Sequence, residues 1–240
     1  MVEHTRPHPR LVKSASPLPG KRVKLEAWIP EVAAVKLKIA VITIDTGSGS
    51  GVYARQFTDH ALFGQVLRDA AAQGGVTFSS VTLTGWSAGH GAIREILSVP
   101  EYYAQVSRVL LIDGLHTGYD GGKAGPLESK LEPDHPEIFL QFARDAGAGK
   151  KAMLVTHSEI FPGTFASTTE TAEWMIGQLG SKRRPVLRHG PMGTQQLSEV
   201  KRGGFLLIGY AGNSAPDPVD QLHSLAEYLR WLSNRAFLSR

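Results

Sequence analysis

Apolar and polar positions alternate along the chain in two distinct patterns. Runs rich in β-branched and aliphatic residues predict strands, and stretches with apolar residues every three or four positions predict helices. The predicted strands cover residues 21–29, 36–45, 80–84, 108–112, 151–156 and 203–210. The predicted helices cover residues 57–73, 88–97, 136–146, 168–179 and 221–237. This alternation indicates an α/β fold, with a mostly parallel sheet and helices on both of its faces.

The remaining segments predict a simple domain organisation. Residues 1–20 contain four prolines and indicate a flexible N-terminal arm. Residues 21–240 are expected to form a single domain, because 240 residues with 42% hydrophobic content can build one sizeable core. Residues 117–136 predict a surface loop, and residues 181–190 predict a basic connector with a short strand. No extended apolar segment lies between the later strands, so we expect a compact domain without a large cap.

The amino-acid composition limits which kinds of partner and chemistry the protein can be expected to have. The chain has 26 Lys and Arg against 22 Asp and Glu, and its one basic cluster, at residues 182–188, has no aromatic neighbours in sequence. We therefore expect no nucleic-acid partner. The absence of cysteine excludes disulfides, thiolate nucleophiles and cysteine-ligated zinc. No apolar run reaches the roughly 18–20 residues of a membrane span, and the first 24 residues lack the apolar core of a secretory signal. A cytoplasmic protein without a membrane partner is expected, and the sequence does not indicate its oligomeric state.

The segment Val81-Thr82-Leu83-Thr84-Gly85-Trp86-Ser87-Ala88-Gly89 carries the strongest chemical signal. It contains the pattern G-x-S-x-G between a predicted strand and a predicted helix. A chain that reverses from strand to helix within a few residues holds the serine in strained dihedrals, with its hydroxyl exposed at the edge of the sheet. Glycines two positions before and after the serine relieve crowding in such a turn. The pattern predicts a nucleophile at Ser87, with the Ala88 N–H facing a developing oxyanion.

At this point the chain resembles the α/β-hydrolase superfamily over roughly residues 22–237. The segment from Val41 to Ser50 resembles the fourth strand of that family and its D-x-x-G-x-G-x-S turn, although only Thr46 separates Asp45 from Gly47. The chain is also similar to an uncharacterised bacterial subgroup with a G-W-S-A-G elbow. It shares with that subgroup residues 111–116, 156–158 and 166–171. The resemblance implies a three-layer α/β-hydrolase fold and no assigned substrate.

A serine nucleophile needs a base, usually a histidine oriented by a carboxylate, and this fold places them in the order serine, acid, histidine. His223 is the predicted base, because it follows the last predicted strand across a loop and opens the final helix. Asp113 is the predicted acid, because it ends the strand after the nucleophile strand. Glu159, one strand later, is the alternative acid. His157 either donates a hydrogen bond that orients a residue of the site or is a buried residue that fixes its loop, and the latter is favoured.

Several other residues near these positions are less favoured candidates for the site. His90 is expected to point away from Ser87, His116 could line the site, and His189 is a less favoured base. Trp86 and Tyr119 could line an acyl pocket, but packing is the commoner role for both.

Residues 31–51 allow two interpretations of the loop that supplies the second donor of the oxyanion hole. If residues 36–45 are the fourth strand of the family, the five residues 31–35 leave no room for the usual third strand and its donor loop. If residues 36–45 are the third strand, Gly47–Gly51 form that loop. A phosphate cradle at Gly47–Gly51 is disfavoured, because the segment lacks the Lys-Ser/Thr of a P-loop.

These observations support two functions. The first is a cofactor-free serine hydrolase that cleaves an ester or related acyl bond of a small molecule through Ser87, Asp113 and His223. The alternative is a non-catalytic binding protein on the same scaffold with an incomplete oxyanion hole, because a fold does not imply an activity.

Overall fold

The computed structural model describes residues 41–44, 49, 51–122, 130–132, 134–212 and 216–234. Its strands are β1 (Val81–Trp86), β2 (Val106–Ile112), β3 (Ala152–His157), β4 (Arg184–His189), β5 (Gln195–Arg202) and β6 (Phe205–Tyr210). Its α-helices are α2 (Val52–Phe57), α3 (Ala61–Gly74), α4 (His90–Leu97), α5 (Pro100–Gln105), α6 (Asp134–Gly147), α7 (Thr168–Gln178), α8 (Pro216–His223) and α9 (Leu225–Ser233). Short 3₁₀ turns are η1 (Ser87–Gly89), η2 (Asp120–Gly122) and η3 (Pro191–Gly193).

The six strands of the described part form one mixed sheet in the order β1-β2-β3-β6-β5-β4. The first four strands of this order are parallel, whereas β5 runs antiparallel to β6 and β4 runs antiparallel to β5. Trp86 pairs with Ile112, Ile112 with Thr156, and Thr156 with Ile208. The carboxyl ends of four parallel strands are therefore aligned at one edge of the sheet, where open α/β sheets bind ligands.

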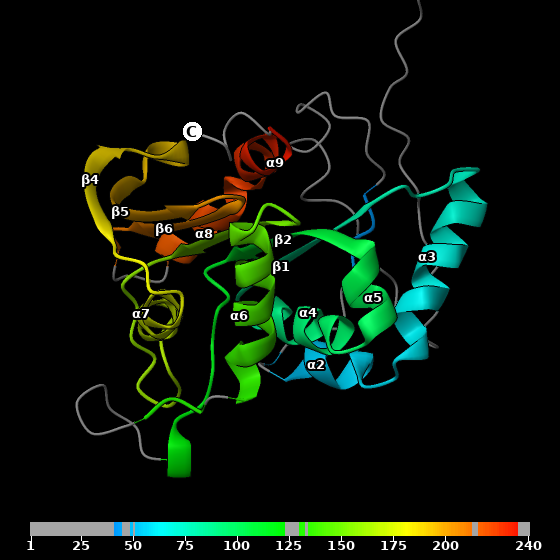
Figure 1. Cartoon of the computed structure of the whole chain (residues 1–240), viewed down its shortest axis with the longest axis horizontal. Coiled ribbons are helices and arrows are strands. Elements are labelled where there is room, and N and C mark those ends of the chain that lie inside the picture. Colours follow the sequence, from blue (N-terminus) through cyan, green and yellow to red (C-terminus); the bar gives the residue numbers. More distant parts are fainter. Residues whose placement is uncertain are drawn as a thin grey trace, which may run out of the picture.

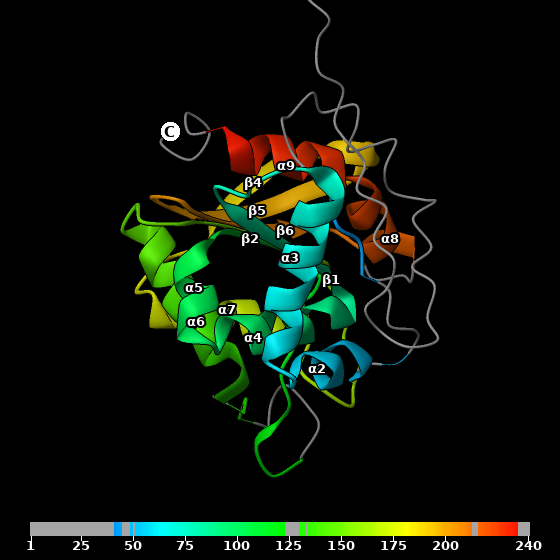
Figure 2. The ribbon, with the colours of Figure 1, turned by 90° about the vertical axis from the view of Figure 1, so that its right-hand side faces the viewer.

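Both faces of the sheet are covered by helices. On one face, Leu111, Val155 and Leu207 pack against α3, α4, α6 and α7. On the other face, Leu110 and Ile208 pack against α9. Figures 1 and 2 show α9 on the opposite side of the sheet from α4, α6 and α7. This arrangement confirms the α/β fold, the mostly parallel sheet and the helices on both faces.

Several predicted elements are corrected in detail. The helix predicted at residues 57–73 corresponds to α3, which begins four residues later, at Ala61, and the preceding helix α2 was not predicted. The helix predicted at residues 221–237 is also two, α8 and α9, because the chain breaks at Ser224, whose hydroxyl donates to the Asp220 carbonyl at 2.8 Å. Sequence patterns missed α5 and also β5, whose sequence QQLSEVKR is mostly polar.

The N-terminal predictions fall almost entirely outside the described residues. These include the arm at residues 1–20, the strand at residues 21–29 and most of the strand at residues 36–45. Residues 41–44 are described and contain no strand, although Ile42 and Ile44 pack against the core.

Candidate functional site

The junction of β1 and η1 has the backbone geometry of a nucleophile elbow. Trp86 is extended, with φ −108° and ψ 136°, and the helical segment begins immediately afterwards. Between them Ser87 adopts φ +47°, a left-handed conformation that is uncommon for residues other than glycine. Within the described part of the chain no hydrogen bond engages the partly exposed Ser87 hydroxyl, while its carbonyl accepts one from His90 Nδ1 at 2.9 Å. The serine is therefore strained, and its hydroxyl is uncommitted.

The two glycines of G-x-S-x-G are not equivalent. A Cβ on Gly85 would lie 2.9 Å from the Gly89 carbonyl carbon and 2.9 Å from Ile93 Cδ1, closer than packed atoms can approach. A Cβ on Gly89 would meet nothing within 4 Å. The expectation that both glycines relieve crowding is right for Gly85 and wrong for Gly89, because Gly89 already lies in the helix with its Cβ direction open.

Asp113 follows β2 and lies beside the elbow. A Cβ on the next residue, Gly114, would lie 3.1 Å from the Ser87 nitrogen and 3.0 Å from its carbonyl oxygen, so the two strand ends are in contact. Asp113 also has a positive φ, +41°, and is 6% exposed. The structure thus brings the predicted nucleophile and the predicted acid to neighbouring, equally strained positions.

The Asp113 carboxylate is held by two residues from distant parts of the chain. Oδ1 accepts the Ser158 N–H at 3.1 Å and the Thr168 hydroxyl at 2.6 Å. Oδ2 accepts the Ser158 hydroxyl at 2.7 Å. Ser158 and Thr168 were not identified as functional residues from the sequence. The signal that could have found them is their position, since residues 156–158 end a predicted strand and residues 166–171 begin a predicted helix.

Two histidines lie next to the elbow. The His90 and His116 rings are 5.6 Å apart at 62°, and the His116 ring meets that of Phe165 at 5.1 Å and 86°. His116 Nδ1 donates to the Ala166 carbonyl at 3.2 Å. Burial lowers the pKa of His116, against the opposing effect of the Ala166 carbonyl. His116 therefore lines this region as a neutral ring at neutral pH.

His223 does not open a helix, contrary to the expectation. His223 is the last residue of α8, because this helix ends before Ser224. Its side chain is exposed. Its helix nevertheless lies against the elbow, since Trp86 Nε1 donates to the Pro218 carbonyl at 3.0 Å. No hydrogen bond between described residues joins His223 to Ser87 or to Asp113.

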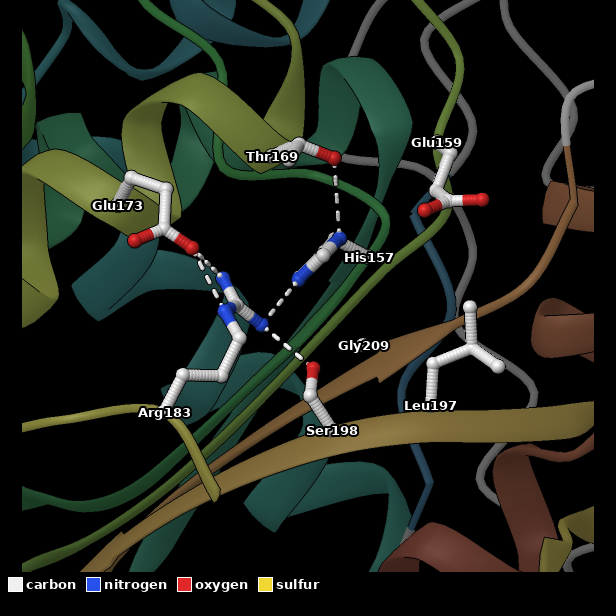
Figure 3. Close-up of a pocket in the computed structure, with 8 residues that line it drawn as sticks. All are labelled: His157, Glu159, Thr169, Glu173, Arg183, Leu197, Ser198 and Gly209. Atoms are coloured by element: carbon white, nitrogen blue, oxygen red, sulfur yellow. Dashed lines mark hydrogen bonds and ion pairs between the residues drawn. The ribbon is translucent and has the colours of Figure 1, made fainter. Parts of the chain in front are cut away.

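His157 lies at the end of β3 in a pocket of about 200 Å³, shown in Figure 3. Its Nδ1 donates to the Ser158 carbonyl at 3.0 Å, and its Nε2 accepts from Arg183 Nη1 at 3.0 Å. Arg183 also bonds Ser198 at 2.8 Å and Glu173 at 2.6 Å. Burial, and secondly the Arg183 charge, lower the pKa of His157 to about 4. This geometry matches the favoured interpretation of His157 as a buried residue that fixes its loop.

The alternative acid, Glu159, lies at the mouth of the same pocket. Its side chain is exposed, and its N–H donates to the Gly212 carbonyl at 2.8 Å. It shares the pocket with His157 and Arg183, whereas Asp113 is buried next to Ser87. Of the two predicted acids, Asp113 is the one in contact with the elbow.

The remaining predicted residues have separate places. Ala88 is the second residue of η1, in the first turn of the helical segment, where backbone N–H groups lack intrahelical acceptors. Of the predicted oxyanion loop, Gly49 and Gly51 are described, and residues 47, 48 and 50 lie outside the described residues. Tyr119 is buried, and its hydroxyl donates to Glu170 at 2.8 Å. Tyr119 therefore supports the start of α7 rather than an acyl pocket.

No helix among the described residues has the length and apolar character to cross a membrane. No group of three or more His, Asp or Glu residues in that part of the chain is placed to hold a metal ion. Comparison of the chain with protein-family models, curated proteins and solved structures gives no match.

Proposed function

We propose that this protein is an α/β-hydrolase-fold serine hydrolase that cleaves an ester or related acyl bond. The observation that carries the proposal is the positive φ of Ser87 at a strand-to-helix junction, with its hydroxyl uncommitted and a buried carboxylate at the adjoining strand end. Strained residues persist where the surrounding structure holds them, and they cluster at active sites. The reaction needs no cofactor.

In the proposed mechanism, the Ser87 oxygen attacks the acyl carbon while an imidazole takes its proton. The Ala88 N–H stabilises the oxyanion of the tetrahedral intermediate. The imidazolium then gives its proton to the leaving alcohol, which departs as the acyl-enzyme forms. A water molecule repeats the attack, the imidazole takes its proton, and Ser87 recovers that proton as the acid product leaves.

We assign the imidazole to His223. The Trp86–Pro218 bond holds the helix that carries it against the elbow. In His90 and His116, Nδ1 bonds the backbone carbonyls of Ser87 and Ala166. Asp113 would orient His223, because a buried carboxylate fixes the tautomer of a catalytic histidine and stabilises its charged form.

Exposed apolar side chains around the elbow favour an apolar substituent on the substrate. Trp86 is 37% exposed, and Val219, beside the Pro218 that Trp86 contacts, is also 37% exposed. Phe165, 36% exposed, packs on His116. Large apolar side chains left exposed beside polar reactive groups are typical of ligand sites.

A fluorophosphonate probe tests the proposal, because it reacts with an activated serine. Wild-type protein should be labelled and should hydrolyse p-nitrophenyl butyrate, and Ser87→Ala should do neither. Ser98→Ala, an exposed serine on the far end of α4, is the matched control and should behave as wild type. His223→Ala should also abolish labelling, whereas His189→Ala should not.

The same experiment distinguishes the hydrolase from the alternative, a non-catalytic binding protein. That alternative is favoured by the absence, among the described residues, of a hydrogen bond between the Ser87 hydroxyl and any imidazole. It predicts that wild type and Ser87→Ala are equally unlabelled and equally unable to turn over the ester, which would end the hydrolase proposal.

A further inference from the structure

The segments Thr156-His157-Ser158 and Ser167-Thr168-Thr169-Glu170 meet at the Asp113 side chain. Ser158 directly follows β3, 45 residues from Asp113, and Thr168 begins α7, 55 residues from Asp113. Together they supply every hydrogen bond that the Asp113 carboxylate accepts from the described residues. We infer that Ser158 and Thr168 are positioning residues that clamp the catalytic carboxylate, an inference that rests on the proposed function.

The clamp leaves one acceptor site open. A carboxylate offers about four lone-pair directions, two on each oxygen. Two bonds occupy Oδ1 and one occupies Oδ2, so one direction on Oδ2 is available to an imidazole N–H. The hydroxyl bonds, at 2.6 and 2.7 Å, have the short lengths of charge-assisted bonds to an ionised acceptor. The clamp therefore keeps the carboxylate in a fixed orientation while leaving one acceptor direction on Oδ2 unused by the described residues.

The partner residues are themselves held firmly. Ser167 caps α7 in a capping box, in which its hydroxyl accepts the Glu170 N–H and the Glu170 carboxylate accepts the Ser167 N–H. The Tyr119 hydroxyl donates to the same carboxylate at 2.8 Å. These bonds place Thr168 in the first turn of an eleven-residue helix, whose positive end further favours a carboxylate charge nearby.

The strain at Asp113 gives a reason for the clamp. A φ of +41° is disfavoured for a residue with a Cβ, so the local backbone alone would not keep the side chain in this place. Three bonds to the carboxylate, together with the Asp113 N–H bond to the Thr156 carbonyl at 3.0 Å, hold it there. Loss of the Ser158 or the Thr168 hydroxyl would leave the Asp113 carboxylate in place but less firmly oriented.

Replacement of Thr168 tests the clamp. Thr168→Val keeps the shape but loses the hydroxyl, and we expect kcat for p-nitrophenyl butyrate to fall at least about tenfold with KM unchanged, because small misplacements of catalytic groups are costly. Thr168→Ser restores the hydroxyl and should recover most of kcat. Thr171→Val is the matched control, since it removes a buried hydroxyl bond on the same helix, from Thr171 Oγ1 to the Ser167 carbonyl, without touching Asp113.

The outcomes separate the clamp from the proposed function. If wild type is active and Thr168→Val keeps its kcat, or if Thr171→Val loses as much kcat as Thr168→Val, the clamp inference is overturned and the hydrolase proposal stands. If wild type is neither active nor labelled, both are overturned. Should Thr168→Val fail to fold, Ser158→Ala removes the bond to Oδ2 and carries the same expectation of a lower kcat at unchanged KM.

Discussion

At the scale of single residues, backbone strain is concentrated at the proposed site. Two of the three non-glycine residues with positive φ in the described chain are Ser87 and Asp113, and they end neighbouring parallel strands. Each such conformation raises the free energy of the folded state by about 1–3 kcal/mol, so contacts with the surrounding structure must hold it in place. At Asp113 the clamp residues supply those contacts, and at Ser87 the packing of Gly114 against its backbone does so.

His157 makes stability depend on pH in a defined window. Its folded pKa of about 4 lies below the ordinary value of 6.5, so between these values the unfolded chain binds the proton first. Stability is therefore lost as pH falls from 6.5 towards 4, by about 2 kcal/mol between pH 7 and pH 5. His157→Gln keeps an acceptor for Arg183 but does not titrate, so its unfolding free energy should fall less over this range. Urea denaturation at both pH values measures the difference.

The control for this prediction is His60→Gln, which replaces an exposed histidine at the start of α3. It should retain the pH dependence of the wild-type protein. An identical loss of stability in wild type and His157→Gln would contradict the buried, neutral state of this ring.

At the scale of elements, the elbow depends on how closely β1 approaches the helix that follows it. Gly85, in β1, faces the Gly89 backbone and Ile93 of α4, and this contact lets the strand turn into a helix without a loop. Close approach at Gly85, rather than relief of crowding at both glycines, is what the turn requires.

Alanine substitutions at the two glycines should therefore differ. Gly85→Ala would force its methyl group to within 2.9 Å of backbone atoms, so we expect a loss of about 1–3 kcal/mol in unfolding free energy. Gly89→Ala has open space and helical dihedrals, so a change within about 0.5 kcal/mol is expected. Urea denaturation of both variants checks this, and equal losses would show that the elbow is not packed as described.

At the scale of the whole molecule, the sheet is buried on both faces. Adjacent residues of β6 belong to different cores, with Leu207 in the core on the face covered by α3, α4, α6 and α7, and Ile208 in the core that includes α9. This double coverage buries both sides of β6, so that adjacent residues along the strand are enclosed in different cores.

Truncation of a core side chain on either face of the sheet should lower the unfolding free energy. Leu207→Ala and Ile208→Ala should each lower the unfolding free energy by about 2–5 kcal/mol, because each leaves a cavity in a closed core. Leu187→Ala, at a residue 77% exposed on β4, is the control and should change it little. A large loss for Leu207→Ala alone would mean that α9 does not pack on the second face as described.

Local sequence patterns predicted much of this architecture. The positions of β1, β2, β3, β6, α4, α6 and α7 could all be identified, because helix and strand periodicity depends on residues a few positions apart. Helices α2 and α5, the break at Ser224 and the polar strand β5 were missed. They depend on packing and strand pairing that periodicity does not describe.

The order of residues along the chain was thus enough to indicate an α/β protein with Ser87 at a strand-to-helix turn. The contacts that define the site could not be obtained in the same way. Ser158 and Thr168 reach Asp113 across 45 and 55 residues, and β6 lies between β3 and β5 although it follows β5 in the chain. Such neighbours depend on strand order and on how helices pack across the sheet, and no spacing within a short segment encodes either.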